Sequence, residues 1–151
     1  MNNIIFLDID GVLNSQKFLI EQNNKNVLDL VERQISDIDP KNLEILKEII
    51  FLTNSKVVIT SSWRKLNIYP LVKEKLIDIG IPIIGETPII ESKRGEEIRK
   101  YIKENNVENY IIIDDDIFED FYELKNYLVK TSFYENGLEE FHKDIAFKLL
   151  K

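Results

Sequence analysis

Ile4-Ile5-Phe6-Leu7-Asp8-Ile9-Asp10-Gly11-Val12-Leu13 is an apolar run that ends in two carboxylates one residue apart, followed by glycine. Its first four residues predict a strand that is buried on both faces. Residues i and i+2 of a strand project on the same side, and open α/β sheets bind ligands at the carboxyl ends of their strands. Two such carboxylates repel unless a cation lies between them. The stretch therefore indicates a divalent metal site with one carboxylate free to act as nucleophile or proton carrier, although an ordinary Asp- and Gly-rich turn stays open as an alternative.

Three further motifs follow in chain order. The apolar segment Lys56–Ile59 ends in the hydroxyl-rich run Thr60-Ser61-Ser62-Trp63-Arg64. The basic pair in Ser92-Lys93-Arg94-Gly95 opens a helical stretch, and Tyr110–Ile113 leads into Asp114-Asp115-Asp116. The chain thus presents an acid pair, a hydroxyl, a base and an acid cluster, three of them at the ends of predicted strands.

The alternation of apolar patterns predicts the fold. Strands are expected at about 3–8, 56–61, 81–84, 110–113 and 127–132, and helices at about 39–52, 69–79, 94–105 and 138–150. Such alternation predicts an α/β, doubly wound, mainly parallel five-stranded sheet with helices on both faces. Residues 14–38 interrupt the alternation. We interpret them as a short insert of one helix and a flap, which is either a lid or a surface excursion.

Composition limits the class of protein. The chain has 151 residues, 44% of them hydrophobic, which predicts one domain over residues 1–151. Neither a membrane span nor a signal peptide is indicated, and there is no cysteine, so a cytoplasmic protein without a membrane partner is expected. The net charge of −7 argues against broad electrostatic binding to nucleic acid but leaves room for a local basic rim. The single histidine, His142, is expected at the surface.

The four motifs, in this order, resemble the haloacid dehalogenase (HAD) superfamily of phosphatases. Leu7–Asn14, Ser61–Arg64, Arg94–Ile98 and the doubled Asp are similar to the small HAD domains associated with RNA-repair proteins. The resemblance implies a Rossmann-like sheet with a minimal cap at about 14–38. Response-regulator receivers combine the same residue types around Mg²⁺, but their acids precede the hydroxyl and their base comes last. In this chain the acid cluster comes last.

The resemblance also implies roles for single residues. Asp8 would attack phosphorus and become an aspartyl-phosphate, and Asp10 would act as general acid and base. Ser61 is the favoured phosphate-binding hydroxyl with Thr60 as the alternative, and the phosphate-binding base is Arg94, with Lys93 sharing the role or replacing it. Mg²⁺ would be bound by the Asp8 side chain, the Asp10 backbone carbonyl and the Asp115 side chain. Asp114 would hold the base or a metal-bound water.

The function implied is a Mg²⁺-dependent phosphomonoester hydrolase, and the substrate stays open. The two candidate substrates are a nucleic-acid terminal phosphate and a small molecule, either a nucleotide or a sugar phosphate. The alternative to an enzyme is a non-catalytic HAD-like binding domain. The oligomeric state is not indicated. Trp63 is expected to pack in the core or to stack on a base, and Arg64 to lie in solvent or to reach a second phosphate. With so short an insert, specificity would come from the rim, where Arg64 and Trp63 are the candidates.

Overall fold

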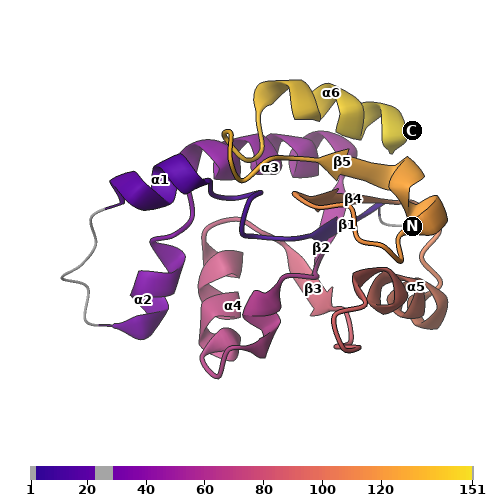
Figure 1. Cartoon of the computed structure of the whole chain (residues 1–151), viewed down its shortest axis with the longest axis horizontal. Coiled ribbons are helices and arrows are strands. Elements are labelled where there is room, and N and C mark those ends of the chain that lie inside the picture. The colour runs from indigo at the N-terminus through magenta and orange to yellow at the C-terminus, as the bar shows by residue number, and fades with distance from the viewer. Residues whose placement is uncertain (1–2, 23–28, 151) are drawn as a thin grey trace.

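The structure, a computed structural model, describes residues 3–22 and 29–150. Five parallel strands form one sheet in the order β3-β2-β1-β4-β5 (Figure 1). The strands are β1 Asn3–Leu7, β2 Ser55–Ile59, β3 Ile83–Glu86, β4 Tyr110–Asp114 and β5 Leu128–Lys130. The predicted five-stranded, doubly wound α/β fold is confirmed.

The central strand explains why the opening apolar run is uninterrupted. β1 pairs with β2 on one side and with β4 on the other. Because helices cover both faces of a parallel sheet, both sets of β1 side chains are buried, and Ile5, Phe6 and Leu7 are 0% exposed. The first polar side chain that follows the strand, Asp8, therefore emerges at the carboxyl edge of the sheet.

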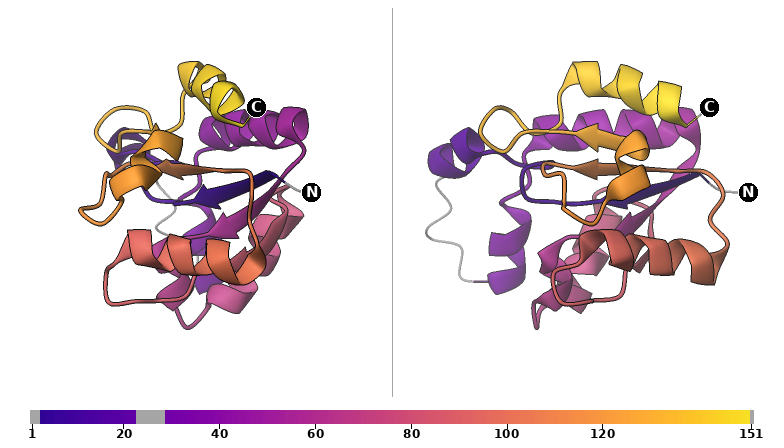
Figure 2. Two further views of the ribbon diagram at one scale, coloured as in Figure 1. Left: turned by 90° about the vertical axis from the view of Figure 1, so that its right-hand side faces the viewer. Right: turned by 45° about the vertical axis from the view of Figure 1, so that its right-hand side comes forward.

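Helices cover the two faces unequally. The α-helices are α1 Gln16–Glu21, α2 Leu30–Ile35, α3 Pro40–Thr53, α4 Tyr69–Asp78, α5 Arg94–Asn105 and α6 Glu140–Leu149, and the 3₁₀ helices are η1 Ser62–Lys65 and η2 Tyr122–Tyr127. α3 and α6 lie along one face and α5 along the other (Figure 2). The larger core cluster contains residues of α3, α4 and α6, and the smaller one contains Ile98 of α5 and Leu124 of η2. Among the residues that the structure describes, no helix is long and apolar enough to cross a membrane.

The insert differs from its prediction. Its described part contains two short helices, α1 and α2, where one helix was expected, and residues 23–28, on which much of the expected flap falls, lie outside the described residues. The Gln22 side-chain amide donates a hydrogen bond to the backbone carbonyl of Ser36, which joins the C-terminal end of α1 to the C-terminal end of α2. The return to the sheet was predicted well, since Asp39 caps α3 and Pro40 lies in its first turn.

Two other sequence predictions are corrected. β3 begins at Ile83 and not at Ile81, because Pro82 has no N–H to give to the ladder, and its carbonyl accepts a hydrogen bond from Val57 before regular pairing starts. His142 is 2% exposed and is not a surface residue. Its Nδ1 accepts a hydrogen bond from the Glu139 N–H at the start of α6, and its Nε2 lies 3.0 Å from the Lys130 carbonyl. Burial lowers the pKa of His142, consistent with a neutral, structural side chain.

Candidate active site

Parallel pairing brings three polar residues together at one edge of the sheet. Leu7 of β1 is paired with Ile59 of β2 and with Ile113 of β4, so the next residues, Asp8, Thr60 and Asp114, lie side by side. The backbone continues this pairing, since Asp8 N–H donates to the Ile113 carbonyl and Thr60 N–H donates to the Leu7 carbonyl, at 3.0 and 2.9 Å. Side chains alternate along strands, which places these three residues on the face covered by α5.

Carboxylates from two motifs form one cluster. Asp8, Asp114 and Asp115 each offer an oxygen, and these three oxygens all lie within 4.8 Å of one another. Asp8 is 7% exposed and Asp114 is 0% exposed. A set of carboxylate oxygens is the donor type that Mg²⁺ prefers, so the cluster fits a hard divalent cation. The Asp10 side chain does not belong to it.

Arg94 supplies positive charge to this cluster. One guanidinium nitrogen lies 2.6 Å from Asp114 Oδ2 and 3.6 Å from Asp8 Oδ1. The guanidinium also lies over the Phe118 ring, 4.6 Å from its centroid. Asp120 fixes the start of α5 by accepting hydrogen bonds from the N–H groups of Gly95 and Glu96. Lys93 precedes the helix and is exposed, so of the two predicted basic residues Arg94 is the one that contacts the acids.

The pKa values show that the acids lack sufficient positive charge. Burial raises the pKa of Asp8 well above its usual range, and the Asp114 carboxylate raises it further, while Arg94 opposes both. Burial likewise raises the pKa of Asp114 to about 6. Burial lowers the pKa of Arg94, but the carboxylates of Asp114 and Asp8 outweigh that effect, and the net shift is upward. One guanidinium therefore does not compensate the buried carboxylates of Asp8 and Asp114, and a bound cation would favour the ionised forms of these two residues.

Gly11 allows the acid cluster to approach the first loop. Its φ is +84°, a conformation that side chains disfavour, and a Cβ there would lie 2.1 Å from Asp115 Oδ2. The Gly11 carbonyl accepts a 2.6 Å hydrogen bond from the Thr131 hydroxyl, which fixes the loop from the β5 side. Glycine is thus required where Asp115 meets the loop.

Asp116 turns the chain after β4, since its N–H donates to Asp114 Oδ1.

The two candidate hydroxyls differ in what they contact. The Thr60 hydroxyl is buried and has no hydrogen-bond partner in the described part of the chain. The Ser61 hydroxyl accepts a 3.1 Å hydrogen bond from the Trp63 N–H and so caps η1. Because Thr60 also lies beside Asp8, we predict that Thr60 is the phosphate-binding hydroxyl, whereas the sequence favoured Ser61.

Matched substitutions separate these two hydroxyls. Thr60→Val keeps the side-chain shape, and we expect it to lower kcat by about 10²-fold, the scale of one lost donor to a transition-state oxygen, with little loss of stability. Ser61→Ala removes a cap and should lower the free energy of unfolding by about 1 kcal/mol, with the smaller effect on kcat. Steady-state kinetics and urea unfolding of both variants would test this. A larger loss of kcat in Ser61→Ala would restore the original assignment.

Trp63 and Arg64 do not form the expected rim. Trp63 is 3% exposed and belongs to the larger core cluster, so it offers no stacking platform. The Arg64 side chain is 4% exposed and pairs with Glu97 at 3.2 Å, so it does not lie in solvent. Lys65 is exposed and lines a cavity of about 210 Å³ together with Arg94. Lys65 is thus an exposed cation in the cavity that Arg94 lines.

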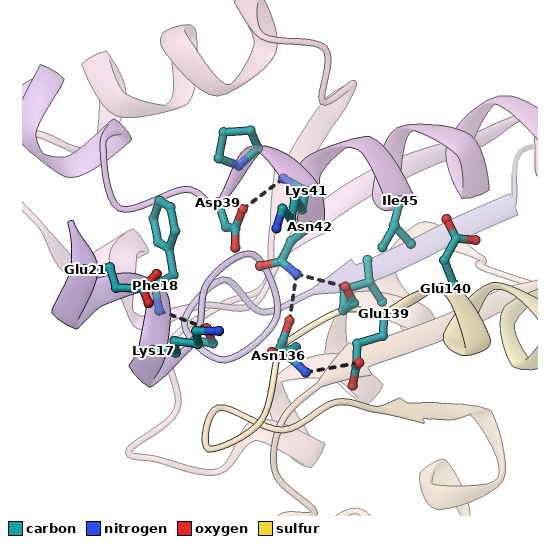
Figure 3. Close-up of a pocket in the computed structure, with 13 residues that line it drawn as sticks. Lys17, Phe18, Glu21, Asp39, Lys41, Asn42, Ile45, Asn136, Glu139 and Glu140 are labelled. Atoms are coloured by element: carbon teal, nitrogen blue, oxygen red, sulfur yellow. Dashed lines mark hydrogen bonds between the residues drawn. The ribbon is translucent and has the colours of Figure 1, made fainter.

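Another cavity lies away from the acid cluster. It has a volume of about 540 Å³ and lies between α1, the start of α3 and the loop before α6 (Figure 3). Its lining mixes both charges, including Lys17, Lys41, Glu21 and Glu139, with the apolar Phe18. Asn42 lines it and donates two hydrogen bonds, to the carbonyls of Asn136 and Leu138. The mixed lining selects no ligand class, so we assign no function to this cavity.

Sequence reasoning missed several residues that build the site. Asn14, Glu97, Asp120 and Thr131 each fix a loop or a side chain next to the acids, and all but Asn14 do so through contacts distant in sequence. For Glu97 a signal existed, because it lies next to Ile98 on the apolar side of α5, where an acid needs a partner. Asp120 and Thr131 carry no comparable local signal.

Comparison with known proteins extends these observations. A family model described as the HAD domain in Swiss Army Knife RNA repair proteins matches residues 4–142. The matched range begins in β1 and ends in α6, and it contains every residue of the acid site. Comparison with curated proteins gave no match.

Proposed function

The chain belongs to the family of HAD domains found in Swiss Army Knife RNA repair proteins, and on that basis we propose that it hydrolyses phosphomonoesters through Asp8. The family supports a HAD-type, phosphatase-like function. The observation that carries the finer proposal is the grouping of Asp8, Asp114 and Asp115 around one point, with Arg94 beside them. Three carboxylates and one guanidinium lie together at one edge of the sheet, which supports assigning them as nucleophile, metal ligands and phosphate-binding cation.

The reaction has two steps. The Asp8 carboxylate attacks phosphorus, the bond from phosphorus to the ester oxygen breaks, and Asp10 gives its proton to the leaving oxygen. Asp10 then takes a proton from water, the resulting hydroxide attacks the aspartyl-phosphate, and inorganic phosphate leaves as the Asp8 carboxylate is regenerated. Arg94 and the Thr60 hydroxyl would hold the phosphate oxygens.

Mg²⁺ would be held by the side chains of Asp8 and Asp115 and by the Asp10 backbone carbonyl. Asp114 would orient Arg94 or a metal-bound water. A bound Mg²⁺ supplies charge that offsets the phosphate oxygens and lets an anionic nucleophile approach an anionic substrate. The arrangement of carboxylates supports this assignment, because Asp8 and Asp114 are buried and otherwise share a single cation.

The metal assignment predicts a difference between neighbouring acids. Asp115→Asn should raise the Mg²⁺ concentration required for half-maximal activity by tenfold or more, since even outer-shell partners of metals change affinity by roughly 10–100-fold. Asp116→Asn is the matched control, because Asp116 contributes to the turn through its backbone N–H. Metal titrations of both variants would test the assignment, and equal effects would contradict it.

For the substrate we propose a terminal phosphate of RNA. The family description names RNA repair proteins, and Lys65 gives an exposed cation in a small cavity beside Arg94. The experiment is a panel of 3′- and 5′-phosphorylated oligonucleotides, nucleoside monophosphates and sugar phosphates, with and without Mg²⁺. Preference for an oligonucleotide end supports the proposal. Faster turnover of a mononucleotide or sugar phosphate would assign a small-molecule phosphatase, and no turnover of any ester would assign a binding domain.

A further inference from the structure

Asp10 is an exposed residue whose carboxylate is nevertheless held at both oxygens. The side-chain amide of Asn14 donates to Asp10 Oδ1 at 2.9 Å. The indole N–H of Trp63 donates to Asp10 Oδ2 at 3.2 Å. An exposed aspartate normally rotates among several rotamers, so two donors from two different loops restrict it to one orientation.

Both donors are themselves fixed. Asn14 is 0% exposed, and its Oδ1 accepts a 2.8 Å hydrogen bond from the Gly11 N–H. A backbone N–H can only donate, so this bond sets which end of the Asn14 amide faces Gly11 and directs the NH₂ group to Asp10. Trp63 is packed in the core at 3% exposure, and its backbone N–H donates to the Ser61 hydroxyl. Neither donor can follow Asp10 if that side chain rotates.

We propose that Trp63 and Asn14 are positioning residues that hold Asp10 for proton transfer to the leaving oxygen. The inference rests on the proposed function, in which Asp10 is the general acid and base. A carboxylate has about four lone-pair positions, and two donors leave free positions to carry the transferred proton. Ordering the side chain before the reaction removes a conformational cost from the step, and a misplacement of about 1 Å can cost about 10²-fold in rate.

This assignment gives Trp63 a second role besides packing. It comes from the loop after β2, which also carries Thr60 and Ser61, whereas Asn14 comes from the loop after β1. The two loops meet at the Asp10 carboxylate. The orientation of the proton donor is thereby coupled to the loop that carries the proposed phosphate-binding hydroxyl.

The test uses leaving groups that differ in their need for a proton. Trp63→Phe keeps an aromatic ring and removes the N–H, and Asn14→Ala removes the second donor. With Mg²⁺, both variants should lose about 10- to 100-fold in kcat/KM, which reports the first step alone, on an alkyl phosphate, whose alkoxide must be protonated. On p-nitrophenyl phosphate, whose leaving group needs no proton, the loss should be within a few-fold. The control is Tyr69→Phe, because Tyr69 also belongs to the larger core cluster and its hydroxyl donates a hydrogen bond to Glu86. This variant should lower the hydrolysis of both esters equally, and only slightly.

A double substitution separates positioning from a structural defect. In an Asp10→Asn background Trp63→Phe should cause no further loss, because the group that it positions has already been replaced. Equal losses on both esters, or the same loss in both backgrounds, would overturn the positioning role while leaving the phosphatase proposal intact. A wild-type protein that hydrolyses neither ester would overturn both.

The hydrogen bond also has a readout that does not depend on turnover. Trp63 is the only tryptophan of the chain, so the protein has a single indole N–H resonance. Asp10→Ala should move that resonance, and Asp116→Ala should leave it in place. An unchanged resonance in Asp10→Ala would show that the indole does not bind Asp10, which overturns the inference.

Discussion

Asp8→Asn is expected to abolish phosphomonoester hydrolysis while leaving the protein folded. Asn has nearly the same shape as Asp but cannot form the aspartyl-phosphate, so turnover should fall by several orders of magnitude, the scale seen when a covalent catalyst is removed. The measurement is single-turnover and steady-state hydrolysis of the best ester from the substrate panel. Activity above about a tenth of wild type would contradict nucleophilic catalysis by Asp8.

Stability provides the control for this variant. Burial and the Asp114 carboxylate raise the pKa of Asp8, so in the absence of metal its ionised form is unfavourable in the folded protein. A folded-state pKa above the unfolded value means that this ionisation costs stability as the pH rises above the unfolded value. Asp8→Asn removes that cost, and its melting temperature in metal-free buffer near neutral pH should equal or exceed that of wild type. A large decrease would mean that lost activity reflects unfolding.

The fold was predictable because its signals are local. The apolar run Ile4–Leu7 and the alternation after it were sufficient for a parallel sheet, and Asp39-Pro40 marked the start of α3 to within one residue. The grouping of Asp8, Asp114 and Asp115 followed as well, because parallel strands bring their carboxyl ends to one edge. The structure adds the register between the strands, which places Thr60 beside Asp8. For this reason we predict Thr60 as the phosphate-binding hydroxyl, whereas the sequence favoured Ser61.

Side chains whose role depends on distant partners were not predictable. Nothing adjacent in sequence indicates that Trp63 reaches Asp10, fifty-three residues away, or that the His142 ring lies against the Lys130 carbonyl. Arg64 follows a hydroxyl motif, and its sequence neighbours allow a solvent-exposed cation. Its true partner, Glu97, lies thirty-three residues further on, at the start of another helix. The position of Glu97 on the apolar side of α5 indicates that it needs a partner, but no local pattern identifies that partner as Arg64.

Arg64→Ala is expected to destabilise the fold more than any other single change proposed. The Arg64 and Glu97 side chains are 4% and 3% exposed, and removing one partner of a buried pair typically costs about 3–5 kcal/mol because the other charge is left uncompensated. Arg64 also donates to the backbone carbonyls of Ser61 and Thr87 and to the Thr87 hydroxyl. Its loss therefore disconnects the loop after β2 from the loop after β3.

The partner of this pair makes the prediction specific. Glu97 also accepts a 2.9 Å hydrogen bond from the Ile90 N–H, and it lies one turn after Arg94 on α5. Urea unfolding should compare Arg64→Ala and Glu97→Gln with an Arg64→Met, Glu97→Met double variant. The double variant should be more stable than Arg64→Ala, because it leaves no buried charge without a partner. If Arg64→Ala costs less than about 1 kcal/mol, the value typical of an exposed pair, Arg64 lies in solvent and returns as a candidate for binding a second phosphate.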